Sequence, residues 1–302
     1  MNQEHILQLK ALLGDAIACD VPMCDYTSFK IGGKADCVLF AKNEEQLRIA
    51  LQFCAENKLP YFVMSNGSNL LVSDRGMRQL VIMIREGFEE IRVEGNFIYA
   101  GAGAKLARVA EAAAEASLTG LEFSFGIPGR LGGALTMNAG AYGGEMMQVV
   151  RSVRIMEKDG TIHDVPAHDL AFGYRTSRIA EGRIALSCVM ELKKGVEAEI
   201  REKMATYQQA RKDKQPLQYP SAGSVFKRPV GYFAGALIEQ ANLKGASVGG
   251  AQVSEKHAGF IINKGGATCQ DVLDLIDFVQ KKVYETSGVK LETELRPVGD
   301  LG

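Results

Sequence analysis

The sequence contains no tryptophan, few histidines and no excess of either charge. Its 35 lysine and arginine residues nearly balance 36 aspartate and glutamate residues, which gives a formal net charge of −1. Without a basic excess, the chain has no general attraction to nucleic acid or to an anionic membrane surface. Only His163 and His168 of the four histidines lie near each other, and no C-x-x-C pair accompanies them, so the sequence does not show the ligand set of a zinc site. We therefore expect no nucleic-acid partner, no membrane partner and no metal.

Long apolar runs and paired cysteines are also missing. No stretch approaches the roughly 18 consecutive apolar residues of a membrane-spanning helix, and residues 1–10 lack the apolar core of a signal peptide. The six cysteines form no C-x-x-C pair and stand mostly among apolar neighbours, as buried reduced thiols do. We expect a soluble cytoplasmic protein, and we expect it to be a monomer.

The chain has 302 residues, of which 46% are hydrophobic, so it is long enough for two or three domains with ordinary apolar cores. Residues 36–64 predict a strand, a helix and a second strand, with Asn43 as the helix cap and Gln46 as its capping partner. Strands are also expected at residues 80–84 and 98–100. The further expected elements are a helix from about Ala104 to just before Gly120, strands at 153–157 and 162–165 joined by an Asp159-Gly160 turn, a strand at 184–192, a polar helix at 195–215, a helix near 233–241, a strand at 258–262, a helix capped by Thr268, and a strand at 291–295. The polar helix ends just before Pro216, which marks the best domain boundary.

Two glycine-rich segments are candidates for a nucleotide cofactor. The first, Gly101-Ala102-Gly103-Ala104-Lys105-Leu106, nearly matches the dinucleotide pattern G-x-G-x-x-G between an expected strand and helix. Leu106 stands where the third glycine belongs, and no strand with a ribose-binding acid follows about 20 residues later. The favoured interpretation is a tight strand-to-helix turn that binds no ligand.

The second segment, from Gly126 to Gly144, holds seven glycines in 19 residues and almost no charge. Glycine lets backbone N–H groups approach a phosphate without an intervening Cβ, and positive φ angles let successive amides converge on one anion. Thr136 and Asn138 add a hydroxyl and an amide donor. Because apolar residues alternate with the glycines, an ordered segment is favoured over a flexible loop. We predict that this segment holds a diphosphate.

The same segment closely resembles a signature of the UDP-N-acetylenolpyruvoylglucosamine reductases, a family of bacterial cell-wall precursor enzymes. Further segments match in the family's order over residues 25–299. They are Asn66-Gly67-Ser68-Asn69-Leu70-Leu71, Tyr174-Arg175, Ser221-Ala222-Gly223-Ser224-Val225-Phe226-Lys227, His257-Ala258-Gly259-Phe260-Ile261-Ile262-Asn263 and Glu294-Leu295-Arg296-Pro297. The short stretch between Arg175 and Ser224 resembles the branch that lacks a tyrosine-bearing insertion, so we assign no tyrosine that covers the substrate.

The resemblance implies an α+β chain in which a two-subdomain FAD-binding fold, of the PCMH or vanillyl-alcohol-oxidase type, is followed by an α+β substrate-binding domain. We expect the FAD-binding subdomains at residues 1–72 and 73–204 and the substrate-binding domain at 205–294, with residues 295–302 packed on the first subdomain. The implied activity uses non-covalent FAD and NADPH as the co-substrate. It reduces UDP-N-acetylglucosamine enolpyruvate to UDP-N-acetylmuramate for peptidoglycan synthesis.

The resemblance also assigns the site residues. Arg175 and Glu294 match the family's catalytic arginine and glutamate, and Ser224 matches its proton donor. The implied cofactor-binding residues are Asn66, Gly67, Ser68, Asn69, Leu70, Gly126, Ile127, Pro128, Gly132, Gly133, Thr136, Asn138, Ala139, Gly140 and Ala141. The substrate-binding candidates are Tyr174, Arg211, Lys214, Lys227, Arg228 and His257.

These residue types suit the chemistry. Hydride transfer to the outer vinyl carbon leaves negative charge beside the substrate carboxylate, which an arginine stabilises because it cannot lose its own charge. A serine is a weak acid, so Ser224 needs a polarising neighbour, and Lys227 is the candidate nearest in sequence. Glu294 would orient the substrate or assist proton delivery.

On the bare sequence, other interpretations stay open. Arg175, Ser224 and Glu294 also fit exposed loop or surface positions, and His257 also fits a core or capping role. Two other functions are possible: an FAD-dependent oxidase of another alcohol or sugar, and a non-catalytic nucleotide-binding protein. The second has no need for three catalytic groups.

Overall fold

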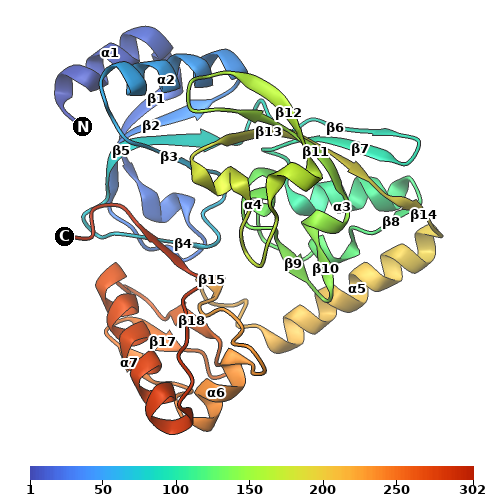
Figure 1. The fold of residues 1–302 in the computed structure, drawn as a ribbon. Helices are drawn as coiled ribbons and strands as arrows, with labels where there is room; N and C mark the ends of the chain where they lie inside the picture. Colours follow the sequence, from blue (N-terminus) through green and yellow to red (C-terminus); the bar gives the residue numbers. More distant parts are fainter. The chain divides into compact units, whose positions relative to one another are not determined.

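The computed structural model describes residues 1–302, apart from the side chain of Glu181. Helices and strands are mixed along the whole chain, as expected for an α+β protein (Figure 1). The chain divides into two compact units. Unit 1 contains Met1–Cys19, Cys37–Asn66 and Gln79–Ala210, and unit 2 contains Asp20–Asp36, Gly67–Arg78 and Arg211–Gly302.

The α-helices are α1 (Gln3–Leu13), α2 (Glu44–Glu56), α3 (Leu106–Glu115), α4 (Leu131–Thr136), α5 (Glu197–Lys214), α6 (Ala234–Gln240) and α7 (Cys269–Ser287). The strands are β1 (Ile17–Pro22), β2 (Lys34–Ala41), β3 (Tyr61–Met64), β4 (Leu70–Val72), β5 (Met77–Ile84), β6 (Ile91–Glu94), β7 (Phe97–Gly101), β8 (Leu118–Thr119), β9 (Gly140–Ala141), β10 (Gly144–Glu145), β11 (Val150–Met156), β12 (Ile162–Pro166), β13 (Ile184–Glu191), β14 (Lys193–Lys194), β15 (Ser221–Ser224), β16 (Ser247–Val248), β17 (Ala251–Val253), β18 (Phe260–Asn263) and β19 (Arg296–Val298).

The first sheet has the strand order β1-β2-β5-β3, in which β3 and β5 run parallel. The helix α2 begins where the sequence predicts it, because Asn43 Oδ1 accepts a hydrogen bond from the Gln46 amide at 2.9 Å. Gln46 in turn accepts from the Lys42 amide at 2.8 Å, one residue before the usual capping-box donor. The predicted apolar stripe of α2, including Leu47 and Leu51, is buried.

A second sheet of unit 1 is antiparallel, with the order β12-β11-β13-β7-β6. The predicted hairpin is confirmed: β11 and β12 pair across the Asp159-Gly160 turn, where Gly160 has a φ of +83°. One predicted boundary is wrong. The helix α3 ends at Glu115 rather than just before Gly120, because Ser117 takes a left-handed φ of +55° and the chain turns into β8.

Unit 2 contains an antiparallel sheet of order β15-β18-β17-β16, which shares one apolar core with α6 and α7. The predicted cap of α7 is confirmed as a full capping box, in which the side chains of Thr268 and Asp271 each accept from the other's amide at 3.0 Å. The expected strand at 291–295 is wrong, because residues 225–227 offer only a short extended partner and a single bridge forms between Phe226 and Thr293. The strand comes later, as β19, which pairs in parallel with β4.

The cysteines are less uniform than expected. Four are buried, whereas Cys19 and Cys24 are half-buried. Burial raises the pKa of the Cys54 thiol to about 11 and, as the largest of several influences, that of Cys269 to about 11, so these thiols stay protonated at neutral pH. Over the described residues, no helix is both long and apolar enough to cross a membrane.

Candidate functional site

The carboxyl ends of two parallel strands define one edge of unit 1. Because β3 and β5 are parallel, the residues that follow them, Ser65 and Arg85, leave the sheet at the same edge. Arg85 Nε donates to the Ser65 carbonyl at 2.9 Å. This edge is where open α/β sheets bind their ligands, and the predicted cofactor residue Asn66 comes next in the chain.

The near-dinucleotide turn after β7 is explained by packing. A Cβ on Gly101 would lie 2.1 Å from the Phe88 carbonyl oxygen, and a Cβ on Gly103 would lie 2.2 Å from that of Arg85. Neither position has room for a side chain, because the backbone of residues 85–88 lies against the turn. Close packing therefore explains why glycine stands at both positions, in agreement with the interpretation of this segment as a tight turn.

The Gly126–Gly144 segment is ordered, as its apolar residues predict. Leu131 and Leu135 of α4 are buried in the core of unit 1. Gly133 lies on the opposite side of α4, where an added Cβ would meet only Ser65 Oγ, at 3.6 Å. Gly133 of the glycine-rich segment and Ser65, the first residue after β3, therefore lie close together within unit 1.

Two polar side chains of this segment donate hydrogen bonds to other groups of the protein. Thr136 Oγ1 donates to the Gly132 carbonyl at 2.8 Å. Asn138 is 1% exposed, and its amide group donates to Glu145 Oε2 at 2.9 Å and to the Gly173 carbonyl at 3.1 Å. Both donors are engaged within the protein, so these side chains brace the segment.

The loop that carries Tyr174 and Arg175 is fastened to the glycine-rich segment. Arg175 has a φ of +57°, and its Nη2 donates to the Gly140 carbonyl at 3.2 Å. Ser177 Oγ donates to the Thr136 carbonyl at 3.0 Å. Tyr174 is 53% exposed, with its ring centroid 5.4 Å from Arg175 Cζ. The structure thus brings together Arg175 and the predicted cofactor segment.

Sequence reasoning missed Ser177 and Gly173, which fasten this loop. Their partners are a backbone carbonyl and an asparagine amide, and a carbonyl occurs at every residue. No pattern in the sequence marks such contacts in advance.

Unit 2 gathers a second set of predicted residues at the end of β15. Ser221 pairs with Ile262 and Ser224 pairs with Phe260, and the register shifts between these two pairs, where Gly223 has a φ of +79°. The paired Ser224 is exposed. Val225 follows Ser224 in the chain, and its carbonyl accepts a hydrogen bond from the Glu294 amide at 2.8 Å.

The predicted loop residue Asn69 belongs to the same cluster. Its Nδ2 donates to the Glu294 carbonyl at 3.1 Å. Ser224, Glu294 and Asn69, which are widely separated in sequence, are therefore neighbours in unit 2.

Two basic candidates of unit 2, Lys227 and Arg228, contact other side chains of the protein. Lys227 Nζ lies 3.2 Å from Glu292 Oε2, an acid that sequence reasoning missed, and this ion pair gives no support to the idea that Lys227 polarises Ser224. The guanidinium carbon of Arg228 lies 4.0 Å from the ring centroid of Phe233. Arg211 and Lys214 lie in the last turn of α5.

His257 has the capping role that was left open. Its Nδ1 accepts from the Gly259 amide at 3.1 Å, and its ring meets Phe260 edge-on with centroids 4.9 Å apart. Burial is the main cause that lowers the pKa of His257 below its ordinary value. A neutral ring is the form that accepts at Nδ1, so the imidazole stabilises the turn that leads into β18.

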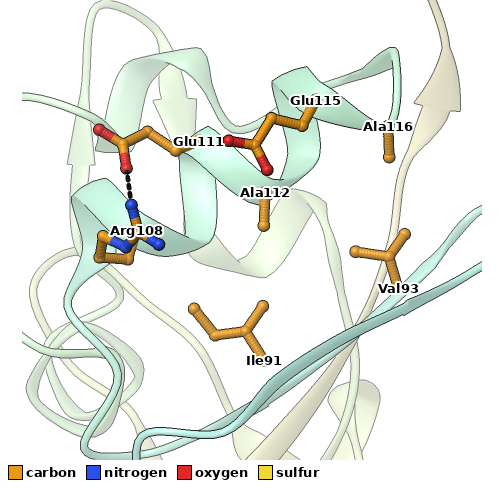
Figure 2. A pocket seen from close by; sticks show the side chains of 7 residues that line it. All are labelled: Ile91, Val93, Arg108, Glu111, Ala112, Glu115 and Ala116. Carbon is orange, nitrogen blue, oxygen red and sulfur yellow. Dashed lines mark hydrogen bonds and ion pairs between the residues drawn. The ribbon is translucent and has the colours of Figure 1, made fainter.

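A hollow of about 430 Å³ lies beside α3, and Figure 2 shows the side chains that line it. Ile91 and Val93 form its apolar side, and Arg108 pairs with Glu111 at 2.8 Å on its rim. None of its lining residues is a predicted site residue. The hollow therefore gives no support to the predicted site.

Comparison with known proteins identifies two domains in the chain. A family model described as an FAD binding domain matches residues 35–166. A second, described as the C-terminal domain of UDP-N-acetylenolpyruvoylglucosamine reductase, matches residues 215–298. The chain is 50% identical over 292 residues to the UDP-N-acetylenolpyruvoylglucosamine reductase of Alkaliphilus oremlandii, with 96% of each chain covered. It is 47% identical over 305 residues to that of Clostridium perfringens, with 99% of each covered.

Solved structures give the same result. The crystal structure of the enzyme of that name from Thermus caldophilus is 37% identical, with a TM-score of 0.81 and coverage of 93% of this chain and 97% of that one. A vanillyl-alcohol-oxidase-type flavoprotein from Myceliophthora thermophila, 11% identical with a TM-score of 0.50 over 64% of this chain and 48% of that one, is similar in fold alone. The expected α+β FAD-binding fold is confirmed, and the chain belongs to the UDP-N-acetylenolpyruvoylglucosamine reductase family.

Proposed function

We propose that this protein reduces UDP-N-acetylglucosamine enolpyruvate to UDP-N-acetylmuramate in peptidoglycan precursor synthesis, with non-covalent FAD as cofactor and NADPH as co-substrate. The observation that carries the proposal is the 50% identity, over 96% of the chain, to a reductase of that name. The FAD binding domain match over residues 35–166 covers both the loop after β3 and the glycine-rich segment.

The glycine-rich segment fits an FAD diphosphate. A Cβ added at Gly133 would meet only Ser65 Oγ, at 3.6 Å, so the space beside this backbone is not filled by packing. The buried leucines of α4 hold the backbone in place. We assign the predicted residues of the 126–141 segment and of the 66–70 loop to cofactor binding. Thr136 and Asn138 act there by bracing the backbone. When bound, FAD supplies hydride transfer from NADPH to the substrate.

Arg175 is proposed to stabilise the negative charge that develops beside the substrate carboxylate. Its guanidinium donates to the Gly140 carbonyl, which uses one of its five N–H donors and limits the directions in which the others point. A fixed cation of this kind needs little reorganisation during the reaction.

Ser224 is proposed to deliver the proton to the carbon beside that carboxylate, and Glu294 to orient the substrate or assist the proton transfer. The exposed position of Ser224 after an irregularity in β15 supports the assignment. The Glu294 backbone is anchored to Val225, so the two residues keep a constant spacing.

The basic residues of unit 2 are proposed to bind the substrate diphosphate. Lys227 and Glu292 are 41% and 75% exposed, and an ion pair that exposed is worth only about 0–1 kcal/mol. A diphosphate can therefore displace Glu292 from Lys227. Arg228, Arg211, Lys214 and Tyr174 remain further candidates for substrate contacts, whereas His257 supports the nearby turn.

We also retain the division into FAD-binding parts at 1–72 and 73–204 and a substrate-binding part at 205–294. The pairing of β19 with β4 supports the placement of residues 295–302 with the first part. We place the protein in the cytoplasm, where NADPH and UDP-sugars are available, and expect a monomer, which light scattering will test.

A direct test uses the purified protein. It should be yellow and release FAD on denaturation, and it should oxidise NADPH only when the enolpyruvyl substrate is added. A colourless protein that does not take up FAD would refute the cofactor assignment. Oxygen consumption with a hydroxyl substrate and no NADPH would favour the oxidase instead.

A further inference from the structure

Two tyrosines from distant parts of unit 1 stack face to face. Tyr142 lies in the glycine-rich segment and Tyr207 lies on α5. Their ring centroids are 4.3 Å apart and their planes differ by 3°. The Tyr142 hydroxyl also donates to the backbone carbonyl of Tyr207 at 3.1 Å. This double contact fixes the Tyr142 side chain against the helix.

Tyr142 occupies a position that tyrosine disfavours. The strands β9 and β10 pair as Ala141 with Gly144, so Tyr142 and Gly143 form a two-residue turn. Both have positive φ angles, of +52° and +82°, which is the pattern of a type I′ turn and favours asparagine followed by glycine. A tyrosine there costs backbone strain, and the stack with Tyr207 is the contact that offsets it.

Helix α5 is held in place by contacts in the turns before Tyr207. Ile200 and Met204, two turns and one turn before Tyr207, are each 4% exposed. Lys203 Nζ lies 3.6 Å from Glu122 Oε1, and Glu122 is itself held by Thr119 Oγ1 at 2.6 Å. The helix is thus anchored over the turns that precede Tyr207, and Tyr207 presents its ring from a fixed support.

Tyr142 is linked to Arg175 through the β9–β10 hairpin. The hairpin that Tyr142 closes begins at Gly140, whose carbonyl accepts from Arg175 Nη2 at 3.2 Å. Glu145, the pairing partner of Gly140, accepts from the buried Asn138 at 2.9 Å. A shift of the hairpin therefore moves the acceptor that orients the guanidinium.

We propose that Tyr207 is a positioning residue for Arg175, acting through the ring of Tyr142 and the β9–β10 hairpin. The inference rests on the proposed function, because it assigns Arg175 to the reduction of the substrate. Tyr207 touches neither substrate nor cofactor in this account. It fixes the hairpin, the hairpin fixes the Gly140 carbonyl, and the carbonyl directs the guanidinium.

The test compares variants of the holoenzyme in two measurements. Tyr207→Leu and Tyr142→Asn both remove the stack, whereas Tyr207→Phe keeps the ring and the backbone carbonyl. In anaerobic single turnovers, the first two should slow reoxidation of the reduced flavin by the substrate about ten- to hundredfold, the range expected for a displaced catalytic group. They should leave flavin reduction by NADPH essentially unchanged. Hydrogen exchange of the 140–145 amides, measured without substrate, should become faster in Tyr207→Leu, in which the disfavoured tyrosine of the turn loses its support.

Three controls separate positioning from general damage. Tyr207→Phe should behave as wild type. Tyr99→Leu, which removes a ring that lies 4.3 Å from Arg92 in the same unit, should also behave as wild type. In an Arg175→Ala background, Tyr207→Leu should cause no further slowing, because its effect passes through Arg175.

Unchanged reoxidation in Tyr142→Asn would overturn the proposal, as would full additional slowing in the Arg175→Ala background. Tyr142→Asn keeps the test valid if Tyr207→Leu does not fold, since asparagine suits the turn. If the substrate does not reoxidise the flavin of the wild type, the proposed function fails. The positioning role is then tested by hydrogen exchange alone, and unchanged exchange of the hairpin amides in Tyr207→Leu would refute it.

Discussion

The backbone amide of Glu294 donates to the carbonyl of Val225, the residue after Ser224, at 2.8 Å. This bond couples a serine at the end of β15 to a glutamate that precedes β19. Because it uses only backbone atoms, substitution of either side chain should leave the spacing intact. The two proposed roles can therefore be tested one side chain at a time.

Ser224→Ala should keep flavin reduction by NADPH and slow flavin reoxidation by the substrate about 10²- to 10⁴-fold, the usual contribution of a positioned proton donor. Rapid mixing of each half-reaction checks this. Ser247→Ala, on the exposed β16, is the matched control and should match wild type. If Ser224→Ala reoxidises at the wild-type rate, Ser224 is not the proton donor.

Arg175→Lys should retain the charge and still slow reoxidation about 10²- to 10³-fold, the loss typical of a misplaced charge-stabilising donor. A lysine ammonium cannot keep both the bond to the Gly140 carbonyl and the fork of donors that a carboxylate accepts. The rate of reoxidation under saturating substrate is the measurement. A wild-type rate would show that charge alone, without the guanidinium geometry, is sufficient.

Much of the fold was predictable because its signals are local. Asn43 and Thr268 mark the starts of α2 and α7, and Asp159-Gly160 marks the β11–β12 turn. The end of α3 was missed because Ser117, an ordinary residue, takes the left-handed angle that the sequence assigned to Gly120. The strand at 291–295 was wrong because strand formation depends on a partner, and residues 225–227 provide a single bridge.

Two glycine substitutions should separate the structural turn from the cofactor segment. Gly101→Ala should lower the free energy of unfolding by about 1–3 kcal/mol, as overpacking does, because its Cβ would meet the Phe88 carbonyl at 2.1 Å. Gly133→Ala should leave stability unchanged, since its Cβ meets only Ser65 Oγ at 3.6 Å, yet weaken FAD binding about tenfold or more, equivalent to about 1.4 kcal/mol.

Denaturant unfolding of the apoprotein and titration of FAD measure the two effects. The opposite pattern would be weak FAD binding in a stable Gly101→Ala variant and normal FAD binding in Gly133→Ala. That result would indicate that FAD binds at the turn after β7 and not at the glycine-rich segment.

The folded protein should lose stability at acid pH through His257. Burial holds the pKa of His257 below its ordinary value of 6.5, so the unfolded chain takes up the proton first. The stabilisation by the neutral ring is complete above that ordinary value and is lost as the pH falls through the lower pKa of the folded state. His257→Asn keeps an acceptor for the Gly259 amide but does not titrate.

Unfolding free energies measured from neutral pH down to about pH 5 should therefore fall less steeply in His257→Asn than in wild type, by roughly 1 kcal/mol, the worth of one hydrogen bond. Parallel profiles would mean that another group controls acid stability.

The candidate site was predictable where the resemblance fixed residues and unpredictable where backbone contacts position them. The sequence led to Arg175, Ser224 and Glu294, but a carbonyl partner such as that of Gly140 carries no signature. Asn138 shows the converse problem. Its amide suits a phosphate, yet burial and the nearby Glu145 engage it within the protein.

The central claim is that this flavoprotein passes hydride equivalents from NADPH to an enolpyruvyl ether of a UDP-sugar. An anaerobic stopped-flow experiment with sequential mixing tests it most directly. The account predicts that NADPH bleaches the flavin absorbance, and that UDP-N-acetylglucosamine enolpyruvate then restores it in one turnover, with UDP-N-acetylmuramate formed in equal amount. Flavin that is reduced by NADPH but stays reduced until oxygen is admitted would contradict the account.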